Sequence, residues 1–86
     1  MNAKRRSKIR AIIDSLTTMS EKLDGINEDL EDVKSDEEEA HEGTNEGKDA
    51  YDEQEEAIDA MEEAYDSLDE ASEQLRNAID SLQQII

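Results

Sequence analysis

Residues 50–84 read AYDEQEE, AIDAMEE, AYDSLDE, ASEQLRN and AIDSLQQ, which is one seven-residue pattern written five times. We name the second residue of each repeat a, so that the first is g and the fifth is d. Positions a and d are mostly apolar, and this period of 3.5 residues is typical of a helix wound against other helices. Gln54 and Ser72 are the polar exceptions, and such residues in a seam set register or choice of partner. The helix–helix interface predicted on this half of the chain consists of Tyr51, Ile58, Met61, Ala64, Tyr65, Leu68, Ala71, Leu75, Ile79 and Leu82.

The first half of the chain carries the same period. Two sets of large apolar residues each recur every seven residues, and the second set follows the first by three. This spacing predicts an apolar seam on a first helix, without a polar residue between Ile9 and Val33. The two sets are Ile9, Leu16, Leu23 and Leu30, and Ile12, Met19, Ile26 and Val33.

Between the two halves lies Gly43-Thr44-Asn45-Glu46-Gly47, where two glycines flank small polar residues and indicate a turn. We predict an all-α fold, an antiparallel two-helix coiled-coil hairpin that forms one domain over residues 1–86. The first helix is expected over about residues 3–42, the turn over 43–47 and the second helix over 48–86. The alternative is a break at Ser35, because Ser35-Asp36-Glu37-Glu38 fits a capping box.

A single hairpin of this length buries little apolar surface, whereas ordering each residue costs about 1–2 kcal/mol of conformational entropy. The alanines at position g widen the apolar side of the second helix and allow another helix to approach closely. We therefore expect a homodimer in which two hairpins form a four-helix bundle. The alternative is that this broad side binds a different protein.

The composition excludes several classes of protein. The net charge is −17 and 41% of the residues are charged, yet the apolar residues lie on one stripe, which argues against disorder. The chain has no cysteine, so it has neither disulfides nor thiol chemistry. No apolar run is long enough to cross a membrane, and no secretory signal is evident. We expect a soluble cytoplasmic protein that does not bind membranes.

Charge is strongly segregated along the chain. Residues 1–10 contain five basic residues and no acid, whereas residues 20–70 contain 23 of the 26 acids and three lysines. An antiparallel hairpin would set the basic segment beside the C-terminal end of the second helix, which we take as its structural role. The alternative is contact with phosphate, but the net charge of −17 argues against direct binding of nucleic acid.

The acids of the second helix fall into outward rows at positions b, e and f. Neighbours three or four residues apart on a helix stand about 5–6 Å from one another, which is close to the spacing of phosphates along a nucleic-acid strand. The alternative is an ordinary solvated helix face without a binding role, although solvated faces usually mix both signs of charge. The predicted partner-binding residues are Glu37, Glu38, Glu39, Asp52, Glu55, Glu56, Asp59, Glu62, Glu63, Asp66, Asp69 and Glu70.

Nothing in the sequence indicates catalysis, a cofactor or a metal site. Glu38 and His41 match one half of the Glu-x-x-His signature of di-iron bundles, but the inward glutamates that complete such a site are not evident. His41 is the single histidine, so a nucleophile has no obvious base. We therefore predict a protein that is not an enzyme.

The chain resembles small acidic helical proteins encoded by bacteriophages and prophages of Gram-positive bacteria. The resemblance is carried by the basic start from Lys4 to Asp14, the run Asp36-Glu37-Glu38-Glu39-Ala40, and Glu55-Glu56-Ala57-Ile58-Asp59 with the heptads that follow. It implies a non-enzymatic binding protein, and small acidic phage proteins often act by occupying a host protein, including defence machinery. The alternative function is a structural module for oligomerisation or assembly of a virion or tail.

Overall fold

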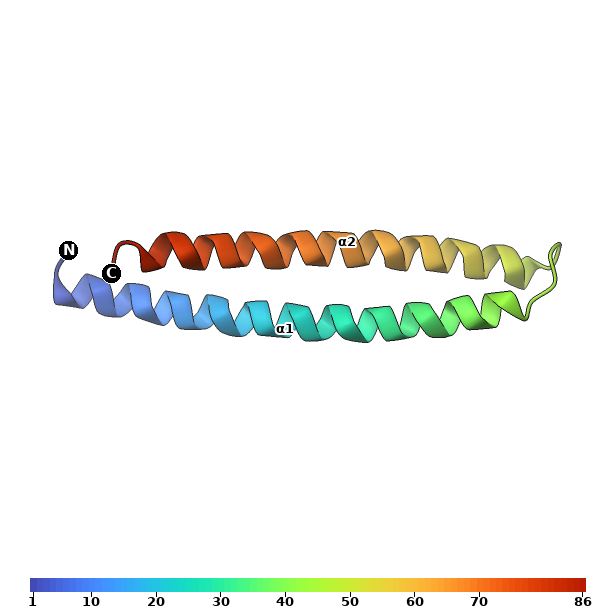
Figure 1. Ribbon diagram of the computed structural model, residues 1–86, viewed down its shortest axis with the longest axis horizontal. Coiled ribbons are helices and arrows are strands. Elements are labelled where there is room, and N and C mark those ends of the chain that lie inside the picture. The colour runs from blue at the N-terminus through green and yellow to red at the C-terminus, as the bar shows by residue number, and fades with distance from the viewer.

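A computed structural model describes residues 1–86 as two long helices joined by a short turn (Figure 1). Helix α1 spans Ala3–Glu42 and helix α2 spans Asp49–Gln83. The helices run antiparallel, side by side, in a rod of 66 × 14 × 14 Å whose two chain ends lie together (Figure 1). The all-helical hairpin predicted from the heptads is therefore confirmed. Helix α1 continues through Ser35, and α2 ends at Gln83, three residues before the expected end.

Local signals explain where the helices begin and end. The Asn2 side chain caps α1, since its Oδ1 accepts a hydrogen bond of 2.9 Å from the backbone N–H of Arg5. Asp49 and Asp52 lie in the first turn of α2, where negative charge stabilises the positive end of the helix dipole. The turn between the helices includes Gly47 at φ 88°, a backbone conformation that favours glycine.

Helix α2 packs on α1 with the a and d positions that its heptads indicate. All of them from Tyr51 to Leu82 are buried or half-buried, whereas Ile86 is 38% exposed and lies beyond the helix. Ser72, a polar position of the seam, is the most deeply buried residue of the chain at 2% exposed. The prediction for this side of the seam therefore agrees with the packing, apart from Ala64 and Ala71, which are exposed and lie beside the seam.

Helix α1 is rotated away from the expected orientation. The row from Ile9 to Leu30 does face α2, but the second row in the seam is one residue further along than predicted. The expectation of a seam without polar residues is wrong, because three of the four members of this second row are polar. The row consists of Ile13, Ser20, Asn27 and Lys34.

The residues that were expected in that place lie outside the seam. They are between 50% and 53% exposed, although they are large and apolar. In the letters used for α2 they occupy position g, while the seam rows of α1 are d and a. These displaced residues are Ile12, Met19, Ile26 and Val33.

The displaced residues lie on the same side of the hairpin as the alanines of α2. Positions e and g flank a seam on opposite sides, and in an antiparallel pair e meets e while g meets g. Asp24 and Arg76, both at position e, form an ion pair of 2.8 Å across one edge of the seam, so the two g rows share the other edge. We call this other edge the apolar face. It consists of Ile12, Met19, Ile26 and Val33 of α1 with Ala57, Ala64, Ala71 and Ala78 of α2.

Two glycines differ in what an added methyl group would do. Gly25 lies within α1 with open space around it, so Gly25→Ala should raise the free energy of unfolding by about 0.5–1 kcal/mol, since alanine is the better helix former. Gly47→Ala is the matched comparison and should lower it by about 1–2 kcal/mol, because the residue is held at φ 88°. Urea denaturation followed by circular dichroism measures both changes. Equal effects of the two substitutions would contradict the assigned backbone conformations.

Candidate partner-binding surface

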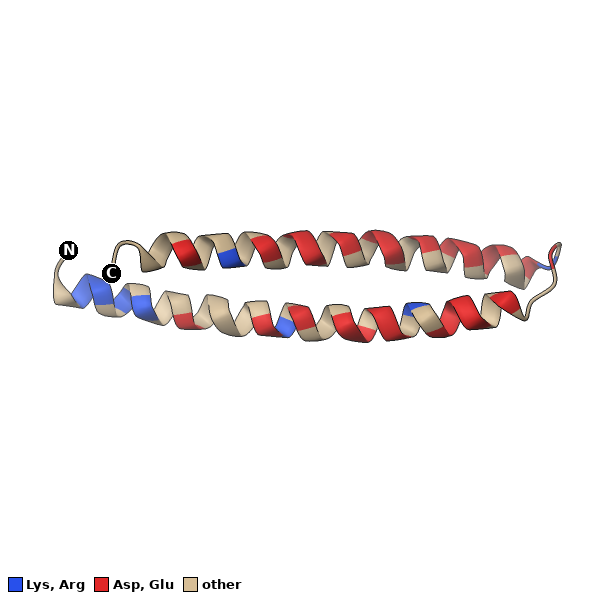
Figure 2. Cartoon of the chain, in the orientation of Figure 1, with Lys and Arg blue, Asp and Glu red and all other residues tan.

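The predicted acidic residues of α2 extend from the edge of the seam, where Glu62 contacts Lys34 of α1, around to the outer side of the helix. All nine of them, from Asp52 to Glu70, are exposed, and no lysine or arginine occurs among them between Asp49 and Leu75. Figure 2 shows acid along most of α2 and along the half of α1 nearest the turn, while the basic residues gather at the start of α1. We call these nine residues, together with Glu38 and Glu39 of α1, the acidic face.

Glu37, which was predicted to be an outward acid of this surface, is half-buried. It continues the row of Ile9, Leu16, Leu23 and Leu30 toward the turn, so it is half-buried at the seam. Glu38 and Glu39, its neighbours, are exposed. The sequence prediction of three equivalent acids near the turn is corrected to two outward acids and one seam acid, because consecutive helix residues point in different directions.

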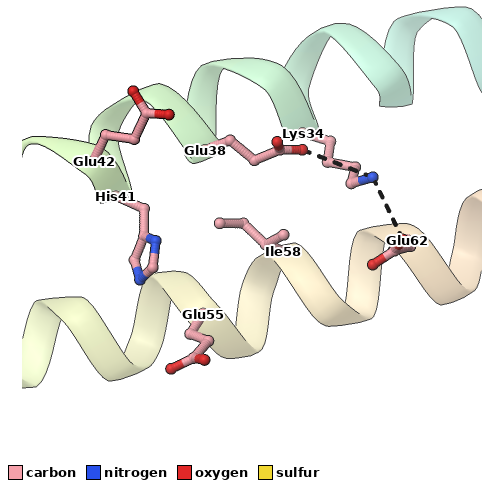
Figure 3. Close-up of a pocket in the computed structure, with 7 residues that line it drawn as sticks. All are labelled: Lys34, Glu38, His41, Glu42, Glu55, Ile58 and Glu62. Carbon is pink, nitrogen blue, oxygen red and sulfur yellow. Dashed lines mark ion pairs between the residues drawn. The ribbon is translucent and has the colours of Figure 1, made fainter.

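One lysine in the seam balances part of the acid near the turn. The Lys34 ammonium lies 3.7 Å from Glu38 Oε1 and 4.0 Å from Glu62 Oε1, so it joins the two helices (Figure 3). Its side chain is 24% exposed, whereas those of both glutamates are more than half exposed. Exposed pairs of this kind contribute roughly 0–1 kcal/mol each, so Lys34 relieves the repulsion near the turn only locally.

The basic segment at the start of α1 has no acidic partner within the chain. Lys4, Arg5, Arg6, Lys8 and Arg10 are all exposed, and none of them forms an ion pair. The hairpin does bring this segment beside the C-terminal end of the chain (Figure 1), as the structural interpretation requires. That end contains no acid after Asp80, so the proximity provides no side-chain partner for the five charges.

A shallow groove of about 340 Å³ lies between the helices near the turn (Figure 3). His41 contributes to it and stacks on Tyr51, with 4.1 Å between ring centroids and 32° between ring planes. The Nε2 atom of His41 is buried without a hydrogen-bond partner. No three histidine, aspartate or glutamate side chains gather closely enough to hold a metal ion, so the structure gives Glu38 and His41 no metal-binding partners. The groove is lined by Lys34, Glu38, His41, Glu42, Glu55, Ile58 and Glu62.

A polar cluster joins the two helices near the middle of the rod. The Ser72 hydroxyl donates a hydrogen bond of 2.7 Å to Asp24 Oδ1, and Arg76 Nη2 donates to Oδ1 at 3.0 Å and to Oδ2 at 2.8 Å. One turn along, Asn27 Nδ2 donates to the Tyr65 carbonyl at 3.3 Å, while Asn27 Oδ1 is buried without a partner. The hydrogen bond from the Ser72 hydroxyl, followed by that from Arg76, lowers the pKa of the Asp24 carboxyl below its ordinary value.

This cluster includes residues that the sequence did not single out. Ser72 stood out as a polar seam position, but Asp24 and Arg76 looked like ordinary helix-surface charges. Arg76 is nevertheless the only basic residue of α2, and an isolated base on an otherwise acidic helix is a signal that could have been used. The partner of Arg76 among the acids of α1 could not be identified without knowing how α1 is rotated about its own axis.

Comparison with other proteins adds no further identification. No protein-family model, curated protein or solved structure matches the chain. Neither helix is both long and apolar enough to cross a membrane. The functional argument therefore rests on the surfaces described above.

The pKa of Asp24 predicts how its contribution to stability depends on pH. Because the folded state lowers this pKa, the contribution is present above the ordinary value of 3.8 and is lost as the pH falls through the lowered value. Asp24→Asn should thus lower the melting temperature at pH 7, and the difference from wild type should shrink as the pH falls below 3.8. Thermal denaturation at several pH values measures this difference.

Asp66→Asn is the matched control for that measurement. Asp66 is exposed on the acidic face and takes part in no hydrogen bond or ion pair, so neutralising it should leave the melting temperature at pH 7 unchanged or raised. A loss at pH 7 of the same size for both variants would show that the Asp24 cluster has no special role.

Proposed function

We propose that this protein acts by binding, and that its acidic face occupies a basic, nucleic-acid-binding surface of another protein. The observation that carries the proposal is the unbroken exposure of nine acids on the outer side of α2, with no base among them. Ordinary solvated helices alternate acids and bases, since such pairs stabilise a helix by about 0.2–0.5 kcal/mol each. The absence of bases costs stability, so binding explains the pattern better than folding does.

The shape of the surface supports the same proposal. From Asp52 to Glu70 the acids extend over roughly 27 Å of a straight helix, at about 1.5 Å per residue. Neighbouring carboxylates on this helix stand about 5–6 Å apart, as successive charges do along a nucleic-acid strand. The rod is 66 Å long and narrow, so these acids are presented along an extended body, as the charges of a strand are.

Electrostatics would make the association fast and sensitive to salt. A net charge of −17 on a small protein attracts a basic surface over long distances and raises the rate of encounter. At physiological ionic strength the attraction is screened beyond about 8 Å, so the final affinity depends on carboxylates that approach the basic groups closely. This requirement assigns the binding to the outward acids of α2 rather than to net charge alone.

The resemblance to small acidic phage proteins suggests where such a partner would be found. In this proposal the protein works in the cytoplasm of a bacterial host and inhibits a host protein that belongs to a defence system recognising nucleic acid. It acts without catalysis and without a cofactor. A basic groove that binds DNA or RNA is the chemistry that an acidic rod can imitate.

A second candidate function is favoured by the apolar face. Four large apolar residues that are about half exposed on one side of a hairpin are suited to assembly with other chains. In that case the protein is a structural module for oligomerisation in a virion or tail, and the acids serve to keep the assembly dispersed. The two candidate functions differ in which surface is required.

Reversal of four outward acids tests the leading candidate. The variant Asp59→Lys, Glu63→Lys, Asp66→Lys and Glu70→Lys changes one continuous stripe whose members take part in no ion pair. The tagged wild type should capture a basic nucleic-acid-binding protein from a bacterial lysate, and double-stranded DNA should displace that protein. The reversed variant should capture at least tenfold less, with unchanged helicity by circular dichroism, because each lost contact weakens the same charged interface.

The matched control places the same change of charge on α1. Asp14→Lys, Glu21→Lys, Glu28→Lys and Asp32→Lys are also outward and exposed, and together they change the net charge by the same eight units. This control should retain capture. Equal loss of capture in both variants would show that net charge rather than the acidic face is responsible, and unchanged capture by the α2 variant would refute the proposal.

A further inference from the structure

The isolated hairpin has almost no apolar core. Only four of its 86 residues are buried, and Ile13 is the single apolar one among them. Its accessible surface is 6409 Å², whereas a folded monomer of its mass is expected to expose about 5,100 Å². The excess of roughly 1,300 Å² exceeds the approximately 800 Å² that each partner buries in a stable complex of standard size.

The large apolar residues that are exposed within the helices all lie on one side of the hairpin. On the apolar face Ile12, Met19, Ile26 and Val33 are about half exposed, next to the alanine row of α2. Beyond that row the outward residues of α2 at positions 60, 67, 74 and 81 are alanine, serine, glutamine and serine, again without charge. Of the acids of α2, only Glu53, at the turn end of this same row, lies on this side. The apolar face therefore has the composition of an interface along most of its length, while the acidic face remains open.

The charge layout decides how a second copy would lie on this face. Two hairpins related by a twofold axis can place their turns at the same end or at opposite ends. The first packing brings the two acidic turn ends together and the two basic N-terminal ends together. Like charges therefore repel at both ends of the bundle. The second packing sets the unpaired basic residues 4–10 of each copy over the acidic turn end of the other, so it is favoured by Coulomb attraction.

The spacing of the large residues fits the second packing. A twofold axis that passes between residues 22 and 23 sets Ile12 opposite Val33 of the second copy and Met19 opposite Ile26. The same axis sets residues 4–10 opposite residues 35–41, which read SDEEEAH and contain four acids and no lysine or arginine. The alanines of α2 then face those of the other α2, where small side chains allow two helices to approach closely.

We propose that the apolar face binds a second copy of this chain, with the turns of the two hairpins at opposite ends of a four-helix bundle. Each basic N-terminal segment pairs with the acids before the turn of the other copy. The inference stands independently of the proposed function, since the nine acids of the acidic face that belong to α2 remain exposed in the dimer. Of the acidic face, only Glu38 and Glu39 of α1 lie opposite the basic segment of the second copy.

The first test measures the mass of the protein in solution and the dependence of its melting temperature on protein concentration. By light scattering the wild type should have twice the chain mass of 9.7 kDa. Its melting temperature should rise between about 5 µM and about 200 µM, because folding is then coupled to association. A folded hairpin with the mass of one chain and a constant melting temperature would overturn the proposal and leave the apolar face to a different protein.

A matched pair of variants locates the interface. Met19→Glu with Ile26→Glu places two charges on the apolar face and should abolish the dimer. Ala11→Glu with Thr18→Glu is the control, because these exposed residues have the same spacing on the outward side of α1. The control should keep twice the chain mass, and a dimer that survives the first pair of substitutions would contradict the assignment.

Cysteine cross-linking tests the orientation even if the charged variant unfolds. The chain has no native cysteine, so Ile12→Cys with Val33→Cys introduces two thiols that are too far apart along one helix to join within a chain. Mild oxidation should convert this variant to a covalent dimer, while each single substitution should stay largely monomeric under denaturing conditions. A dimer by light scattering that gives no covalent product would overturn the packing with turns at opposite ends.

Discussion

The hydrogen bonds that Ser72 and Arg76 donate to Asp24 fix the rotation of α1 about its own axis, and the surfaces of the molecule follow from that rotation. With Asp24 turned to the edge of the seam, Ser20 and Asn27 enter the seam and the row from Ile12 to Val33 turns outward. Rotating α1 by one seventh of a turn, roughly 50°, would exchange these two rows. The exchange would bury more apolar surface within the hairpin but would separate Asp24 from its partners.

The rotation divides the hairpin into surfaces with different chemistry. One edge of the seam contains the ion pairs of Asp24 with Arg76 and of Lys34 with Glu62, which determine the pairing of the helices. The other edge is the apolar face, where no charge determines a register within the chain. The outer side of α2 is the acidic face. Because these surfaces point in different directions, self-association through one of them leaves another free for a partner of a different kind.

Some of this arrangement was predictable from sequence and some was not. The heptads of residues 50–84 predict α2 and its seam because a and d there are apolar and outward positions are charged, so only one orientation is consistent. The glycines at 43 and 47 predict the turn. In α1 the large apolar residues form two rows, and the further row that the structure places in the seam is apolar only at Ile13. Apolar periodicity alone therefore favours a rotation of α1 that differs from the one observed. The choice depends on Asp24 and Arg76, which are 52 residues apart in the chain, and local periodicity does not reveal such a contact. Glu37 could have been placed from the sequence, because it continues the row from Ile9 to Leu30, which lies in the seam in either rotation of α1.

Charge and apolar surface together explain how such a chain can leave large hydrophobic residues exposed without associating at random. An apolar face of this kind on a neutral rod would bind any similar surface, whereas like charges on two acidic rods repel at most relative orientations. The repulsion is lowest where the basic segment of residues 4–10 meets acid, and the attraction is greatest where the apolar faces meet. Both conditions are fulfilled together only in one relative placement of two copies. In the proposed dimer, the acid that weakens the single hairpin therefore acts as a source of specificity, because it restricts association to partners with a complementary pattern of charge.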